Sequence, residues 1–508
     1  MSSTSPETTH TSTASETAAD HVVDAVVERA SRAFDALSGL EPAVLAAGLD
    51  AAAEALGTQA DELVDLAARE TGLTPARLTG ELRRTRVQLR LFARVAERGE
   101  HLDVRIDPPD PDFALGVPRD DLRRVLVPVG PVAVFAASNF PFAFSVAGGD
   151  TAAALAAGCT VVVKAHPGHP ALSRRVCDIV ASALAEASLP EGTLQIVEGQ
   201  EAGVALLRHP GIRAASFTGS LHAGRFLADV AASRPDPIPF FGELGSVNPV
   251  VVTKAGLEAS RDQLAAGFVA SVSGSAGQLC TKPGFLLVPS DWGLDDDLAA
   301  AAAEVAEHRL LNPGIADGYA ARRDAILGTE GVRVVHEGSL RRDGLWQGWT
   351  TPTIVAVSLE TLRRHRETLL DEAFGPLSIV VAYDESADLS AALLELFPGN
   401  LTSTLHAGHD ETGPDVQAIV RTMARTSGRV LLRGWPTGVA VTPAMQHGGP
   451  WPATTTDATS VGTAAIARFL RGVAFQGAPD ALLPPSVRDA NPWHVPQSRC
   501  AAGESVEW

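Results

Sequence analysis

The chain has 508 residues, of which 45% are hydrophobic and 20% are charged, an ordinary balance for a soluble globular protein of about two to four domains. Its formal net charge of −19 argues against nucleic-acid or anionic-membrane partners, because like charges repel. The four cysteines have no paired spacing, so we expect neither a disulfide framework nor a bound metal, and we predict a reducing, cytoplasmic setting.

The N-terminal segment carries little apolar sequence. Residues 1–20 are rich in Ser and Thr, and we predict that they form a disordered tail. They lack the basic start and the apolar core of a signal peptide. No stretch of the sequence approaches the roughly 18 consecutive apolar residues of a membrane span, so we expect no membrane partner.

Residues 22–98 have the apolar spacing of amphipathic helices. Several arginines fall opposite the apolar stripe, and we interpret them as a solvated or salt-bridged surface: Arg83, Arg84, Arg86, Arg90 and Arg94. Residues 101–127 then become rich in Pro and Asp and end in an alternating strand over 122–127. This segment is interpreted as an arm that reaches another subunit.

From residue 131 the chain alternates short apolar runs with longer amphipathic ones. The runs predict strands and intervening helices, which is typical of parallel β-α-β units. The strands are predicted over 131–137, 160–163, 194–197 and 214–217. Ligands bind beyond the carboxyl ends of such strands. The residues at these ends are small or polar: Asn139, Lys164, Thr218, Gly219 and Ser220.

Phosphate-binding motifs narrow the possibilities. The dinucleotide fingerprint G-x-G-x-x-G is absent from the sequence. Residues 219–224 have the glycine spacing of a P-loop, but Arg225 and Phe226 replace its Lys and Ser/Thr, which excludes an ATP site of that kind. A helix that begins after the Gly219-Ser220 turn still offers backbone amides to a phosphate.

Cys280 lies in the run Gly277-Gln278-Leu279-Cys280-Thr281-Lys282, within a segment of small and polar residues. Backbone amides can approach a ligand beside the sulfur there, and such a setting can lower the pKa of a thiol. The loop therefore predicts a nucleophile. A small buried hydrophobic residue is the other interpretation of a free cysteine, and the loop by itself leaves both open.

Seven motifs in order decide between these interpretations: Pro128-Val129-Gly130-Pro131, Ser138-Asn139-Phe140-Pro141-Phe142, Val163-Lys164-Ala165, Phe217-Thr218-Gly219-Ser220, Glu243-Leu244-Gly245-Ser246, Gly277-Gln278-Leu279-Cys280 and Glu372-Ala373-Phe374-Gly375-Pro376. The set resembles the aldehyde dehydrogenase superfamily from about residue 22 to the C-terminus. Two of the chain's motifs are most similar to those of one branch, the NADP-type 2-oxoglutarate semialdehyde (2,5-dioxopentanoate) and bacterial fatty aldehyde dehydrogenases. These motifs are Lys164-Ala165-His166-Pro167 and His447-Gly448-Gly449-Pro450.

The resemblance implies roles for four catalytic residues. Cys280 would attack the aldehyde, and Asn139 with the Cys280 backbone N–H would form the oxyanion hole. Glu243 would activate the water that hydrolyses the thioester. His447 is expected near the active site. The other interpretation is that the Gly-Gly-Pro loop only needs a polar residue there that tolerates unusual backbone angles.

The resemblance also implies a dinucleotide site, formed by Ser138, Lys164, Thr218, Gly219, Ser220, Glu372 and Phe374. Lys164 and Glu372 would hold the two riboses, and the Gly219-Ser220 turn would lie under the pyrophosphate. Pro167 stands where NAD-preferring relatives often carry an acidic residue, which favours NADP and leaves NAD possible. Arg174 and Arg208 are candidate partners of a 2′-phosphate by chain position.

The fold implied is α/β, with a Rossmann-like cofactor domain (residues 21–100 and 128–242), an α/β catalytic domain (243–467) and a β oligomerisation extension (101–127 and 468–508). We therefore expect a homodimer or homotetramer that oxidises an aldehyde, 2-oxoglutarate semialdehyde or an aliphatic one. Two alternatives are a CoA-acylating enzyme, against which Glu243 counts, and a catalytically silent nucleotide-binding relative, which would not need the full residue set.

Overall fold

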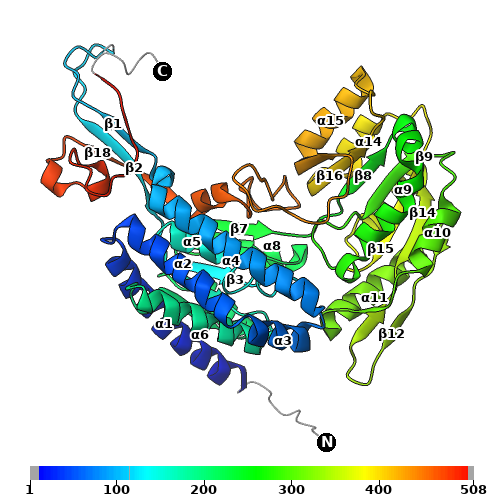
Figure 1. The fold of residues 1–508 in the computed structure, drawn as a ribbon, viewed down its shortest axis with the longest axis horizontal. Helices are drawn as coiled ribbons and strands as arrows, with labels where there is room; N and C mark the ends of the chain where they lie inside the picture. The colour runs from blue at the N-terminus through cyan, green and yellow to red at the C-terminus, as the bar shows by residue number, and fades with distance from the viewer. Residues whose placement is uncertain (1–10, 114, 502–508) are drawn as a thin grey trace, which may run out of the picture.

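The computed structural model describes residues 11–113 and 115–501, which form two α/β bodies and a protruding arm (Figure 1). The first helix, α1 (Thr11–Leu37), begins inside the segment predicted to be a tail. Residues 11–20 are therefore helical, and residues 1–10 lie outside the described ones. Further along the same helix, Val23 is buried in the core.

A parallel sheet of five strands in the order β5-β4-β3-β6-β7 forms the first body, here called the five-stranded body. Its strands are β3 (Val132–Phe135), β4 (Val161–Lys164), β5 (Leu194–Val197), β6 (Ala214–Thr218) and β7 (Phe240–Glu243). Both faces are buried, as is usual for parallel strands. Val132 and Val134 face one core, whereas Ala133 and Phe135 face the other.

Helices cover both faces of this sheet. One core includes residues of α2 (Pro42–Thr58), α3 (Ala60–Thr71), α4 (Pro75–Arg98), α5 (Gly149–Ala156) and α6 (Pro170–Glu186). The opposite core includes residues of α1, α7 (Gln200–Arg208) and α8 (Leu221–Ala232). This two-sided arrangement agrees with the parallel β-α-β units predicted from the alternating apolar runs.

A second sheet, in the order β11-β14-β15-β9-β8-β16-β17, forms the seven-stranded body. Its strands are β8 (Pro249–Val252), β9 (Phe285–Pro289), β11 (Arg333–His336), β14 (Thr353–Ser358), β15 (Leu377–Tyr383), β16 (Asn400–His406) and β17 (Ser427–Leu432). Only the edge strand β11 runs antiparallel to its neighbour among these strands. Val250 and Val251 alternate between the two cores that flank the sheet.

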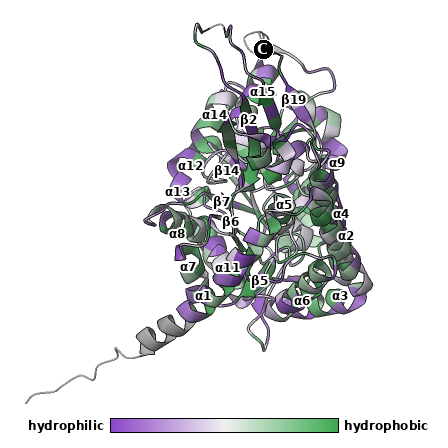
Figure 2. Cartoon of the chain, turned by 90° about the vertical axis from the view of Figure 1, so that its left-hand side faces the viewer, coloured by the Kyte–Doolittle hydropathy of each residue, from purple (hydrophilic) through white to green (hydrophobic). Residues whose placement is uncertain are grey.

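The helices of the seven-stranded body again lie on both sides of its sheet. They are α9 (Lys254–Ser273), α10 (Asp295–Ala303), α11 (Pro313–Leu327), α12 (Leu359–Arg364), α13 (Arg366–Leu369), α14 (Leu389–Leu396) and α15 (Pro414–Thr426). Figure 2 shows hydrophilic residues on outer helices such as α12 and α13. A small sheet is added by β10 (His308–Arg309), β12 (Leu340–Arg342) and β13 (Gly348–Thr350).

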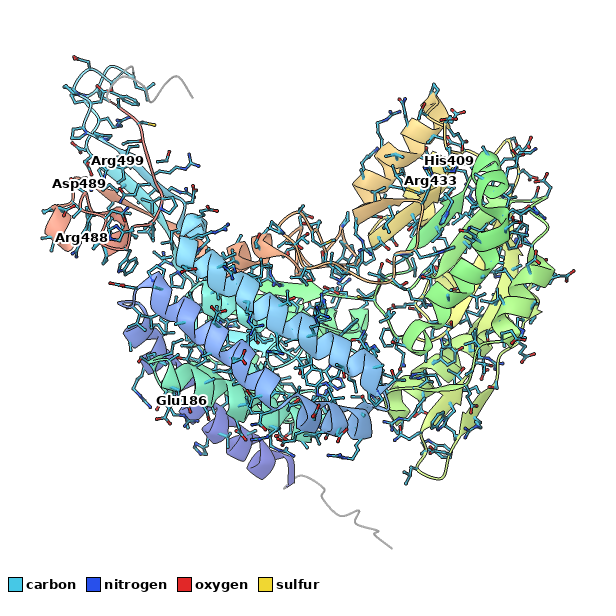
Figure 3. All side chains as sticks on the ribbon, in the orientation of Figure 1. Glu186, His409, Arg433, Arg488, Asp489 and Arg499 are labelled. Carbon is cyan, nitrogen blue, oxygen red and sulfur yellow. The ribbon has the colours of Figure 1, made fainter. Side chains whose placement is uncertain are left out.

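The arm is a four-stranded sheet in the order β18-β2-β1-β19. Its strands are β1 (Val104–Asp107), β2 (Leu122–Pro128), β18 (Leu470–Gln476) and β19 (Gln497–Arg499). The arm therefore joins segments more than 300 residues apart in the chain, as the pairing of Leu122 with Gln476 shows. Figure 3 shows Arg499 and Asp489 on the arm, where Arg499 Nη1 donates to Asp489 Oδ1 at 3.1 Å.

The chain crosses between the two bodies at β7 and β8. Glu243 is the last residue of β7, and the next strand already belongs to the other sheet. The segment that contains Cys280 follows α9 and the short helix η2 (Gly274–Gly277). In the part of the chain that the structure describes, none of the helices is both long and apolar enough to cross a membrane.

Candidate active site

The carboxyl ends of the central strands open onto a cavity of about 1080 Å³. Residues from both bodies line it, and they include every predicted site residue except His447: Ser138, Asn139, Lys164, Thr218, Gly219, Ser220, Glu243, Cys280, Glu372 and Phe374. The cavity lies at this edge because all five strands of the first sheet point the same way.

The loop before Cys280 has an unusual backbone. Ser275, Ala276 and Gly277 have φ values of 52°, 54° and 67°, in the left-handed region. Gly277 tolerates no side chain, because a Cβ there would lie 2.3 Å from the carbonyl oxygen of Gly375. Such strain at three successive residues is usual where a chain positions a functional group. Its effect here is to present the half-buried Cys280 to the cavity.

Cys280, His447 and Glu243 form one cluster. The Sγ atom of Cys280 lies 3.7 Å from Nε2 of His447. The same nitrogen lies 3.0 Å from Oε1 of Glu243. His447 is fully buried and Glu243 nearly so, and they come from segments more than 200 residues apart. His447 therefore belongs to the site although it does not line the main cavity.

The Glu243 carboxylate is held by side chains on both of its oxygens. Ser460 Oγ donates to Oε2 while His447 contacts Oε1. Burial raises the pKa of Glu243, but His447 and the hydrogen bonds from Ser460 and Cys280 outweigh it, and the pKa lies below its usual range. Glu243 is thus an ionised base against the nucleophile.

The donor arrangement fixes the tautomer of His447. Among the residues that the structure describes, Nδ1 of His447 is buried without a hydrogen-bond partner. Leaving a donor unpaired in the interior costs free energy, so we assign the proton to Nε2, from which it donates to Glu243. The backbone N–H of His447 donates to Oγ1 of Thr459 at 2.8 Å. Sequence reasoning missed both Thr459 and Ser460, which lie outside the seven motifs.

The pKa of the Cys280 thiol is shifted in the direction opposite to the one that its loop suggested. Loop amides suggested a lowered pKa, but burial and the negative charges of Glu243 and Glu372 raise the pKa of Cys280 well above its usual value. Arg84 acts in the opposite direction. The thiol is therefore protonated at neutral pH, and its proton must leave before the sulfur can attack.

Asn139 is fixed beside the nucleophile loop. Its side-chain Nδ2 donates to the backbone carbonyl oxygen of Gln278 at 3.0 Å. The backbone carbonyl oxygen of Asn139 accepts from Nη2 of Arg77 at 2.7 Å. The side-chain amide carries two N–H groups. One is used by Gln278, which leaves the other for an oxygen in the cavity.

Helix α4 supplies polar groups that sequence reasoning assigned to the surface. Arg84 is half-buried, and its guanidinium stacks 5.3 Å from the ring centroid of Phe144. Glu81, on the same face of α4, accepts the backbone N–H groups of Phe142 and Ala143 at 2.8 and 3.0 Å. The solvated-surface interpretation holds for Arg83 but is wrong for Arg84, because helical periodicity alone does not show where the neighbouring loop packs.

Comparison with known proteins identifies the chain. The model of the aldehyde dehydrogenase family matches residues 1–393. The chain is 42% identical to alpha-ketoglutaric semialdehyde dehydrogenase 2 of Azospirillum brasilense over 96% of this chain and 93% of that protein. It is also 42% identical to alpha-ketoglutaric semialdehyde dehydrogenase of Acinetobacter baylyi over 88% of this chain and 85% of that protein. The chain belongs to the aldehyde dehydrogenase family.

The fold agrees with this assignment. The structure of 1-pyrroline-5-carboxylate dehydrogenase from Thermus with bound NAD superposes with a TM-score of 0.72, at 20% identity, over 90% of this chain and 85% of that one. The predictions of the family, of its fold and of an NAD(P)-dependent oxidation of an aldehyde to an acid are confirmed.

The cavity of this aldehyde dehydrogenase fits a nicotinamide dinucleotide. Ser220 caps α8, so the free amides of that helix face the cavity beside Gly219. The half-buried Lys164 lines the same wall, and burial lowers its pKa. A side chain at Gly219 would lie 2.6 Å from the ring of Phe217, so glycine keeps this turn narrow.

Glu372 interacts electrostatically with Lys282, a lysine whose role sequence reasoning missed. Burial raises the pKa of Glu372 and lowers that of Lys282, and each charge opposes the shift of the other. Lys282 Nζ donates to the carbonyl oxygens of Ala373 and Leu377 at 3.1 and 2.7 Å. The lysine thereby fixes the segment that carries Glu372 on the wall of the cavity.

One group of side chains in the described residues has metal-ligand spacing. The ligand atoms of Glu243, Cys280 and His447 all lie within 4.8 Å of one another. In an aldehyde dehydrogenase the thiol has to remain free to attack, so a metal bound there would block it.

Proposed function

We propose that this aldehyde dehydrogenase oxidises 2-oxoglutarate semialdehyde to 2-oxoglutarate. The observation that carries the reaction type is the Cys280–Glu243–His447 cluster, in which the nucleophile and an ionised base lie within 4.8 Å of each other. The substrate is supported by the names of the two relatives that are 42% identical over most of this chain.

In the first half-reaction, the Cys280 thiol loses its proton to solvent and the sulfur adds to the aldehyde carbon. The free N–H of Asn139 stabilises the oxygen of the tetrahedral adduct, with an effect of about 3–4 kcal/mol for a good donor. NAD(P)⁺, when bound, accepts the hydride of this adduct. Cys280 is then left as a thioester.

In the second half-reaction, water attacks the thioester carbon. Glu243, held by His447 and Ser460, takes a proton from that water. The C–S bond then breaks, the carboxylic acid leaves, and the proton on Glu243 returns to the Cys280 thiolate. A CoA-acylating enzyme would not need this base. A carboxylate within 4.8 Å of the Cys280 sulfur supports hydrolysis and not acyl transfer to CoA.

For the cofactor we propose NADP, with NAD as a slower substitute. Pro167 lines the cavity without a charge that would repel a 2′-phosphate. Glu198 also lines the cavity, and Arg174 donates to its carboxylate at 2.7 and 2.8 Å. Arg174 thus neutralises this carboxylate and is our candidate partner for the phosphate. Neither Arg174 nor Arg208 is among the described residues of the cavity wall, and Arg174 is preferred because it contacts the wall residue Glu198.

We further propose a cytoplasmic homodimer or homotetramer, assembled through the arm. Leu115, Val117 and Leu482 are exposed by 78%, 64% and 75%, and they lie in the two segments assigned to the oligomerisation extension. Covering such side chains removes apolar surface from water. Size-exclusion chromatography with light scattering measures the assembly, and a Leu482→Lys variant should shift it towards the monomer.

The test of the function is a panel of aldehydes assayed by the absorbance of reduced nicotinamide. Purified enzyme should oxidise 2-oxoglutarate semialdehyde with a higher kcat/KM than pentanal, faster with NADP than with NAD, and equally with and without CoA. A strict dependence on CoA would overturn the hydrolytic assignment. A preference for the uncharged aldehyde would overturn the substrate.

A further inference from the structure

Arg84 carries an unused hydrogen-bond donor beside the nucleophile. Its Nη1 atom is buried and has no hydrogen-bond partner among the residues that the structure describes. Most buried polar groups are paired, and a guanidinium left unpaired is costly. A donor of this kind, near a reacting group, points to a partner that arrives with the substrate.

The charge of Arg84 reaches the reacting atoms. It interacts electrostatically with Cys280 and with Glu243, as well as with Glu81 on its own helix. The ring of Phe144, over which Arg84 lies, has its centroid 6.3 Å from that of His447. Arg84, Phe144 and His447 are not among the described residues that line the cofactor cavity. A chain of neighbouring side chains therefore runs from Arg84 through Phe144 and His447 to Cys280.

Other cations near the cluster are already engaged. Arg429 on β17 also interacts with Cys280, but its two terminal nitrogens donate to the carbonyl oxygens of Gly438 and Pro436. Lys282 donates to two backbone carbonyls. Arg84 is thus the cation of these three whose guanidinium has a terminal nitrogen left for a ligand.

We propose that Arg84 determines specificity by binding the carboxylate at the far end of the substrate. The inference rests on the proposed function, because it requires an aldehyde that carries an acidic group. A planar guanidinium suits a carboxylate, and binding in a half-buried site strengthens the contact. Phe144 beneath the guanidinium holds it in place, and Glu81 fixes the loop that carries Phe144.

The test compares two aldehydes of five carbons, 2-oxoglutarate semialdehyde and pentanal, in three variants. Arg84→Gln should lower kcat/KM for the acidic aldehyde about 10- to 100-fold relative to pentanal, mainly through KM, since a hydrogen bond to a charged group is lost. Arg84→Lys should restore part of this ratio. Arg83→Gln, on the exposed side of the same helix, should leave both substrates unchanged.

Two further measurements separate the explanations. Binding of 2-oxoglutarate, the product, should weaken by a similar factor in Arg84→Gln in calorimetry, which needs no turnover. Circular dichroism melting checks folding, and if Arg84→Gln does not fold, Arg84→Lys is compared with wild type in the same assays. Equal losses for both aldehydes, with unchanged product binding, would mean that Arg84 acts on the thiol and would overturn the proposal.

Failure of the proposed function looks different. Wild-type enzyme that prefers pentanal would overturn the acidic substrate and, with it, the role of Arg84. Wild-type enzyme that prefers the acidic aldehyde, with the same preference in Arg84→Gln, would overturn the role of Arg84 alone.

Discussion

His447 Nε2 lies 3.0 Å from Oε1 of Glu243, so a buried imidazole holds the carboxylate that we propose as the general base. The pair places the base against the Cys280 sulfur, which lies 3.7 Å from the same nitrogen. A glutamate on a strand end would otherwise sample several rotamers. His447 and Ser460 restrict the Glu243 carboxylate to one position. Substituting each residue in turn therefore tests its contribution to the cluster.

The nucleophile is tested by Cys280→Ser. An alkoxide is much harder to form at neutral pH than a thiolate, so aldehyde oxidation should be abolished. Dinucleotide binding should persist, because the residues expected to hold the riboses and the pyrophosphate, such as Lys164 and Glu372, are unchanged. Activity is followed at the absorbance of reduced nicotinamide, and binding by fluorescence titration. Turnover near that of the wild type would exclude Cys280 as the nucleophile.

Removing the base should slow the second half-reaction more than the first. General-base assistance is worth about 10²–10⁴-fold, so deacylation should limit the rate in Glu243→Gln. Rapid mixing with excess aldehyde should show a burst of reduced cofactor close to one per site, followed by a slow phase, with an acyl adduct on Cys280 in intact-mass spectra. Glu191→Gln, an exposed carboxylate, serves as the control. The lack of both burst and adduct would show that Glu243 is needed before hydride transfer.

The thiol should titrate at high pH. The pKa of Cys280 is raised by burial and by the charges of Glu243 and Glu372, so alkylation by iodoacetamide without cofactor should accelerate only as the pH rises above the usual range of a cysteine. Loss of one negative charge stabilises the thiolate, so Glu243→Gln should move the midpoint to lower pH. A midpoint that does not move would mean that Glu243 does not face the thiol.

Ser460 should lower the pKa of the general base Glu243. Its hydroxyl helps to keep the pKa of Glu243 low, so Ser460→Ala should raise that pKa. The base works only when ionised, and the acid limb of kcat should therefore move to higher pH, with activity lost earlier on acidification. At neutral pH the cost should be about 10- to 100-fold, as for one hydrogen bond to a charged group. Ser38→Ala, an exposed serine, should leave the profile unchanged.

Zinc ions should inhibit the enzyme at the cluster. A thiolate, an imidazole and a carboxylate are ligands that Zn²⁺ accepts, and three of them lie within 4.8 Å here. Inhibition should be reversed by a chelator and should protect Cys280 from alkylation. His447→Asn should weaken the inhibition. If this variant and the wild type are inhibited equally, the metal binds elsewhere.

The sequence by itself predicted the fold and most of the site, because both rest on local patterns. The apolar run at 194–197, for example, predicts β5 at the positions where it lies. Loop residues such as Asn139 and Cys280 stand out because their motifs need particular backbone geometry. The first residues of α1 were missed, since their helix depends on anchorage in the core further along the chain.

What only the tertiary structure decided is how distant residues meet. Ser460 and His447 reach Glu243 across more than 200 residues, and a free-standing serine carries no motif. Helical spacing alone predicts that Arg84 lies on the surface. It does not show that Phe144, from a loop in another part of the chain, packs against it. The pKa of Cys280 rises for the same reason: burial and neighbouring charges are properties of the packed site, which no local pattern contains.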